Sequence, residues 1–201
     1  MTIPRRLPLV LSCVLAGALL WPGAALANIG VPMILLTLPG MVLTLIPVVL
    51  LEVWVLAGRL TLPARTAFRV SAWANAATTF VGVPVTWFLL YLLEMFTGGG
   101  QAYGIETPLQ KFLAVTWQAP WLIPYEMDGN LRWMVPTAAM WLLVPSFFTS
   151  WWLETRVARR LLKDADPARL SAAMLRANLL SYVFLELLAV AWLVYSVHFD
   201  R

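Results

Sequence analysis

The chain has 201 residues, of which 61% are hydrophobic and only 12% are charged, and its mean hydropathy is +0.80. A soluble domain of this length cannot bury so large an apolar fraction, so the composition predicts an integral membrane protein. The net charge of +4 would favour an acidic partner in a soluble chain. In a membrane protein basic residues instead report topology, and no nucleic-acid partner is expected.

The first 27 residues have the features of a secretory signal peptide. Arg5 and Arg6 precede an apolar run over residues 7–20, and small residues stand at Ala25 and Ala27. A basic start, a short apolar segment and small residues before a cleavage point predict a signal peptide over residues 1–27 that is removed from the mature chain. The alternative is a short first span that is retained.

Residues 28–96 form the first predicted transmembrane hairpin. Its first apolar stretch contains Pro32, Pro39 and Pro47. Each proline removes a backbone donor, so we expect this helix to be kinked or partly unwound at its start, with the true span over residues 41–57. The second span is predicted over residues 71–96, with a kink at Gly82 and Pro84.

Residues 97–132 are predicted to be an outer loop. Within it, the segment 107–118 has apolar side chains at helical spacing, which predicts a short amphipathic helix at the membrane surface. These side chains are Leu109, Phe112, Leu113 and Trp117.

Residues 133–201 form the second predicted hairpin, with spans over residues 133–153 and 177–197. Between them, Asp166 followed by Pro167 predicts a helix start, because Asp caps helices and Pro fits the first helical position.

Two basic turns set the predicted orientation. The first holds Arg59, Arg65 and Arg69, and the second holds Arg156, Arg159, Arg160, Lys163, Arg169 and Arg176. The rest of the chain after residue 27 has only Lys111, Arg132 and Arg201. Because excess Lys and Arg marks the cytoplasmic side, both turns are expected inside, and the outer loop and mature termini in the periplasm of a bacterial inner membrane.

The two hairpins share a pattern that predicts an internal repeat. Glu52 precedes Asn75 by 23 residues and Glu154 precedes Asn178 by 24. Three residues after each Asn stands a hydroxyl, Thr78 or Ser181. Repeats of this kind build many membrane bundles, although two unrelated hairpins could share these features by chance.

Polar residues inside the spans are the candidate functional residues, because they are costly in lipid and therefore face the bundle interior. The candidates are Glu52, Asn75, Glu154, Asn178 and Glu186. Glu186 is the strongest, because it lies about 15 Å beyond Arg176 at the helical rise of about 1.5 Å per residue. Glu154 is expected to pair with Arg156 or to reach outward. These groups could serve as interhelical hydrogen bonds, as a proton or cation site, or as contacts to another membrane subunit.

The sequence contains no catalytic constellation. Ser/His pairs, paired histidines, Gly-rich phosphate loops and cysteine pairs are absent, so no cofactor or metal site is predicted and an enzyme is the weakest interpretation. The leading functional prediction is an accessory or assembly subunit of a membrane complex, with the lipid bilayer and other subunits as partners. The alternative is a small homo-oligomeric transporter or channel that uses the buried Glu and Asn residues.

Overall fold

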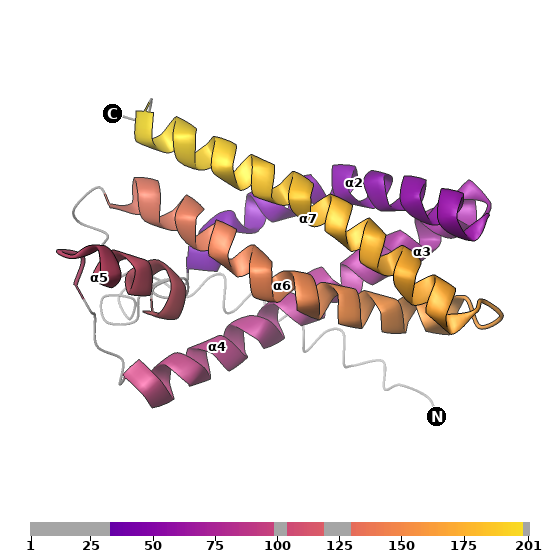
Figure 1. The fold of residues 1–201 in the computed structure, drawn as a ribbon, viewed down its shortest axis with the longest axis horizontal. Coiled ribbons are helices and arrows are strands. Elements are labelled where there is room, and N and C mark those ends of the chain that lie inside the picture. Colours follow the sequence, from indigo (N-terminus) through magenta and orange to yellow (C-terminus); the bar gives the residue numbers. More distant parts are fainter. Residues whose placement is uncertain (1–32, 99–103, 119–129, 199–201) are drawn as a thin grey trace, which may run out of the picture.

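The computed structural model describes residues 33–98, 104–118 and 130–198, and the regular elements in these ranges are all helices (Figure 1). They are α2 (Met33–Leu60), α3 (Ala64–Ala77), the π-helical segment η1 (Thr78–Gly82), α4 (Val83–Gly98), α5 (Pro108–Leu113), the π-helical segment η2 (Ala114–Gln118), α6 (Leu131–Leu161) and α7 (Pro167–His198). The predicted signal peptide lies outside the described residues.

Four helical stretches among the described residues are long and apolar enough to cross a membrane. They are Gly40–Leu60, Ala64–Thr97, Leu131–Leu161 and Pro167–His198. An apolar helix of about 20 residues spans the hydrocarbon core of a bilayer, and each stretch reaches that length. Large apolar side chains also point outward along them, as with Phe96, which is 86% exposed. The described chain is therefore all-helical and has four helices that could cross a membrane, in agreement with the class that the composition predicts.

Of the two outcomes expected for the start of α2, a kink or partial unwinding, the described residues exclude unwinding. Helix α2 is α-helical from Met33 to Leu60 and continues through Pro39 and Pro47. A proline within a membrane helix is tolerated where neighbouring groups satisfy the freed backbone. The stretch Gly40–Leu60 of α2 is long and apolar enough to span a membrane, and it contains the predicted span over residues 41–57.

The second span changes its helical geometry at its middle. Helix α3 begins at Ala64, directly after Pro63 and seven residues earlier than predicted. At Thr78 the helix changes from α-helical to π-helical geometry, which continues through η1. Helix α4 follows, with Pro84 near its start. Insertion of a π-turn reorients the following helix, and Figure 1 shows α4 diverging from the other long helices. The irregularity therefore falls close to the kink predicted at Gly82 and Pro84.

The other long helices pack into one bundle. Helix α2 contacts α3 and α7, and α6 contacts the same two helices. The turn between α2 and α3 lies at the same end of the bundle as the turn between α6 and α7 (Figure 1). The buried cluster near this end is rich in alanine, including Ala67, Ala74, Ala158, Ala173 and Ala177. Small side chains let helix backbones approach closely, which is the usual basis of packing in membranes.

The segment at 107–118 is helical, as predicted, but a different face is buried. Thr107 and Gln110 form a reciprocal capping box at the start of α5. Ala114 and Val115 are buried against α6, whereas Leu109 is 66% exposed. The spacing of apolar residues predicted the helix correctly. Which of its side chains are buried is decided by contact with α6 rather than with lipid.

The turn before α7 has the predicted cap. The backbone N–H of Arg169 donates to Oδ1 of Asp166 at 2.7 Å, and Pro167 is the first residue of the helix. This pairing satisfies one of the free N–H groups at a helix start.

Candidate functional site

Glu52 of α2 is the centre of a buried hydrogen-bond network. Its side chain is 1% exposed. Oε2 accepts from the hydroxyl of Ser71 at 2.8 Å and from Nδ2 of Asn75, both on α3. Oε1 accepts from the hydroxyl of Ser181 on α7 at 3.1 Å. One carboxyl group therefore joins three helices through neutral donors.

Glu154 of α6 has a closely similar environment. It is 2% exposed. Oε2 accepts from Nδ2 of Asn178 on α7 at 2.8 Å, and Oε1 accepts from the hydroxyl of Thr78 at 3.2 Å. Oδ1 of Asn178 is buried and finds no hydrogen-bond donor within the described part of the chain. This carboxyl group therefore also accepts from a neutral amide and a neutral hydroxyl.

The two sets of hydrogen bonds follow one crossed pattern. Each Glu accepts from the Asn of the helix that follows it in the chain, Asn75 or Asn178. Each also accepts from the hydroxyl three residues beyond the other Asn. Glu52 lies eight residues before the end of α2 and Glu154 seven before the end of α6, which places both about 10–12 Å from the turns at the helical rise.

The two crossing hydroxyls each have a second acceptor. Thr78 is 3.0 Å from the carbonyl oxygen of Asn75, and Ser181 is 3.1 Å from that of Asn178. A hydroxyl has one hydrogen to donate and can also accept. Each hydroxyl can therefore donate to its own backbone and accept a hydrogen from the facing carboxyl group. The carboxyl oxygens and the crossing hydroxyls therefore keep their hydrogen bonds whether a carboxyl group is ionised or protonated on the side of the hydroxyl.

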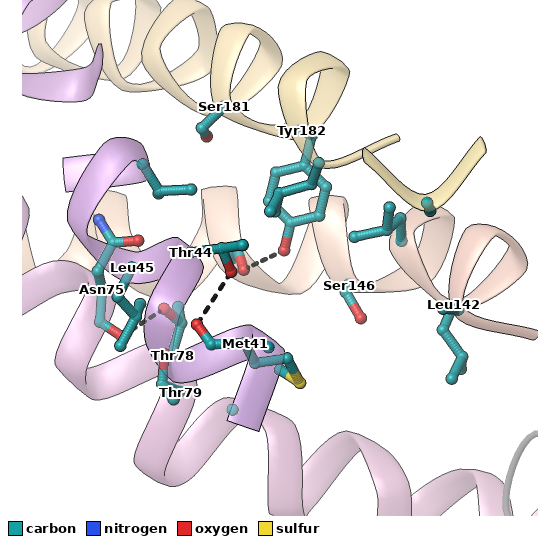
Figure 2. A pocket seen from close by; sticks show the side chains of 18 of the residues that line it. Met41, Thr44, Leu45, Asn75, Thr78, Thr79, Leu142, Ser146, Ser181 and Tyr182 are labelled. Carbon is teal, nitrogen blue, oxygen red and sulfur yellow. Dashed lines mark hydrogen bonds between the residues drawn. The ribbon is translucent and has the colours of Figure 1, made fainter. Parts of the chain in front are cut away.

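A cavity of about 500 Å³ extends from this network between the helices (Figure 2). Thr78, Glu154 and Ser181 line one part of it, and Glu154 is the one acidic group among its described lining residues. The lining continues along α7 as far as Trp192, which is about 16 Å from Ser181 at the helical rise. Its volume lies in the range of small-molecule sites.

The walls of the cavity combine apolar side chains with hydroxyl groups. Figure 2 shows Thr44, Ser146, Ser181 and Tyr182 among the side chains around it, contributed by different helices. The hydroxyls of Tyr182 and Ser150 are 2.7 Å apart. A mostly apolar cavity with a few convergent polar groups is typical of a binding site.

Comparison with known proteins finds no match. No family model, no curated protein and no solved structure matches this chain.

Four of the five candidate residues come together in this network. Glu52, Asn75, Glu154 and Asn178 are all buried and bonded within it. Glu186, expected to be the strongest, is half-buried on α7 and is not among the described residues that line the cavity or hydrogen-bond to the two carboxyl groups. The depth of a residue along a helix does not fix the side to which its side chain points.

The expectation for Glu154 was wrong. It neither pairs with Arg156 nor reaches outward. The guanidinium of Arg156 instead stacks over the ring of Trp152, 3.8 Å from its centroid. Since side chains two positions apart on a helix point in different directions, proximity in sequence to a basic residue was a poor guide.

Sequence reasoning missed two residues of the site. Ser71 lies four residues before Asn75 and so shares its helical face, which is a signal that could have been used. Ser150, which bonds to Tyr182, lies four residues before Glu154 on α6 in the same way. Among the described residues no three His, Cys, Asp or Glu side chains are grouped as a metal site would require.

Proposed function

We propose that this protein is a small transporter or channel of the bacterial inner membrane in which Glu52 and Glu154 bind and release protons. The observation that carries the proposal is the crossed network of neutral donors around the two carboxyl groups. Among the described residues, the hydrogen-bond donors to both groups are neutral, so none of them would hold a carboxyl group permanently ionised. Ionisable residues within membrane spans commonly mark proton relays.

The two crossing hydroxyls support proton binding rather than a purely structural role. Thr78 and Ser181 can each turn their hydrogen to a backbone carbonyl and accept one from a protonated carboxyl group. A carboxyl group can therefore gain and lose a proton without breaking its hydrogen bond to the crossing hydroxyl. An unpaired buried polar atom would otherwise cost about 1–3 kcal/mol.

The cavity provides a route to these groups. Glu154 lines it directly, and Ser181 both lines it and donates to Glu52. A proton that enters along the cavity reaches Glu154 first, and Ser181 links the same space to Glu52. Because four spans are few for a transport path, we infer a homo-oligomer in which each copy contributes one such site.

Two further features belong to this proposal. We take the crossed hydrogen bonds as support for a repeat of two tandem hairpins, with Glu52 and Glu154 in equivalent positions. We also infer that the basic turns lie in the cytoplasm and that the outer loop is periplasmic, because the turns occur at one end of the bundle (Figure 1) and basic residues mark the inner side.

Proton flux in reconstituted vesicles tests the proposal. We expect the purified full-length protein to dissipate an imposed pH gradient, measured with a trapped pH-sensitive dye. Glu52→Gln and Glu154→Gln should each abolish the flux. The Gln oxygen can accept from the neighbouring Asn and the amide N–H can donate to the crossing hydroxyl, but an amide cannot carry a proton. Glu186→Gln is the matched control and should retain the flux. Flux that persists in both variants of the network would overturn the proposal.

A second candidate function is an accessory or assembly subunit, and the exposure of α4 favours it. In the most apolar 18 residues of the span Ala64–Thr97, only 7% of the residues are buried. The corresponding share is 22% in each of the other three spans. Phe88 and Phe96 of α4 are 52% and 86% exposed. Gentle-detergent purification with intact mass determination separates the two functions. A stoichiometric foreign partner would favour the subunit, and a homo-oligomer would favour transport.

A further inference from the structure

A second cavity lies between α2 and α7 on the outside of the bundle, separate from the carboxyl network. It has a volume of about 650 Å³, and two arginines, Arg59 and Arg176, line it together with apolar side chains. Arg59 is in the last turn of α2, and both arginines are exposed. Of the described residues that line this groove, none is acidic.

The groove is charged at one end and apolar at the other. Trp54 lies five residues before Arg59, and Val183 lies seven residues beyond Arg176. At the helical rise these distances are about 7 Å and about 10 Å, and both lead away from the basic turns into the span. Trp54 and Val183 are 72% and 50% exposed, so the apolar part of the groove is open to the surrounding lipid.

Gly58 keeps the groove open near its charged end. It lines the groove, and a Cβ atom added there would meet nothing within 4 Å. A larger side chain at this position would therefore enter the groove rather than the packed interior of the bundle.

We propose that this groove binds an acidic phospholipid, with its phosphate between Arg59 and Arg176 and one acyl chain along Trp54 and Val183. A guanidinium group binds phosphate through two parallel hydrogen bonds, and two arginines from different helices can bind one phosphate from both sides. Basic pockets between membrane helices on the cytoplasmic side favour anionic headgroups, and the other residues of the two basic turns raise the local concentration of such lipids.

The inference does not depend on proton binding. The groove is formed by the outer faces of α2 and α7, and it shares no lining residue with the cavity at Glu154. A lipid bound there would contact both helices and hold them together at the end where the buried alanine cluster lies.

Native mass spectrometry of the full-length protein tests the assignment. The purified protein is titrated with phosphatidylglycerol, with phosphatidylcholine, and with inorganic phosphate. We expect tight binding of one phosphatidylglycerol. The double variant Arg59→Gln/Arg176→Gln should weaken that binding about 30-fold, since each basic residue near the surface contributes about 1 kcal/mol, or about fivefold.

A matched double variant separates this site from a general effect of charge. Arg65→Gln/Arg159→Gln removes two exposed arginines of the basic turns that do not line the groove. It should leave the binding of the single phosphatidylglycerol nearly unchanged. Equal loss in both double variants would overturn the proposal and reduce the effect to non-specific attraction.

Gly58→Leu tests the apolar part of the groove without changing any charge. It should weaken phosphatidylglycerol binding while the arginines remain in place. Should this variant fail to fold, the two arginine double variants still decide the question. Three outcomes would each overturn the assignment. They are equal affinity for phosphatidylcholine, displacement of the lipid by inorganic phosphate, and a second copy of the chain in the groove.

Discussion

Replacing Glu52 by Leu should lower the stability of the protein, whereas replacing it by Gln should not. Glu52 accepts three hydrogen bonds, from Ser71, Asn75 and Ser181. Leu fills a similar volume but leaves all three donors without this acceptor. Gln keeps an oxygen for Ser71 and Asn75 and turns its amide N–H toward Ser181, whose hydroxyl can accept it. We therefore expect the Gln variant to be as stable as the parent and the Leu variant to be less stable.

The size of the Leu effect follows from the number of bonds. Hydrogen bonds between membrane helices contribute on average about 0.6 kcal/mol and at most about 1.7 kcal/mol, so three bonds give about 2 to 5 kcal/mol. Ser71 and Ser181 each keep a backbone carbonyl as a second acceptor, at 3.4 Å and 3.1 Å. We therefore expect a loss in the free energy of unfolding near the lower value.

Denaturation by sodium dodecyl sulfate in lipid bicelles measures this free energy, and the 11 tryptophans provide a fluorescence signal. Glu186→Leu is the matched control, because Glu186 is half-buried and takes part in none of the hydrogen bonds described for the network. A Gln variant as unstable as the Leu variant would refute the reasoning, since it would mean that the network needs an ionised carboxylate.

Two further results are expected. The first is a double-mutant cycle with Thr78→Val and Glu154→Leu. Its coupling energy should be about 0.6 kcal/mol, because the two side chains share one hydrogen bond between helices. Additive effects of the two substitutions would show that this bond contributes nothing to stability. Ala189→Trp should reduce proton flux, because Ala189 lines the cavity and is 8% exposed. Leu187→Trp, on an outward-facing position that is 64% exposed, serves as its control, and equal flux from both variants would exclude the cavity as the proton route.

Local features were predictable because they depend on residues close together in the chain. The Asp166 cap and the helix at 107–118 follow from hydrogen bonds within one turn. The four long apolar helices follow from composition, because about 20 apolar residues suffice to cross a bilayer. The depth of Glu52 in its span followed in the same way, from counting residues to the nearest turn.

Which polar groups meet was decided only by tertiary structure. The positions of Glu154 and Glu186 along their helices can be counted from the sequence. The rotation of each helix about its axis cannot, because it depends on the close packing of helix backbones at small residues such as Ala74 and Ala177. That packing places Thr78 against Glu154 across 76 residues of sequence and leaves Glu186 half-buried. The cavity beside Glu154 arises from the same packing, because it lies between helices whose separation no single stretch of sequence encodes.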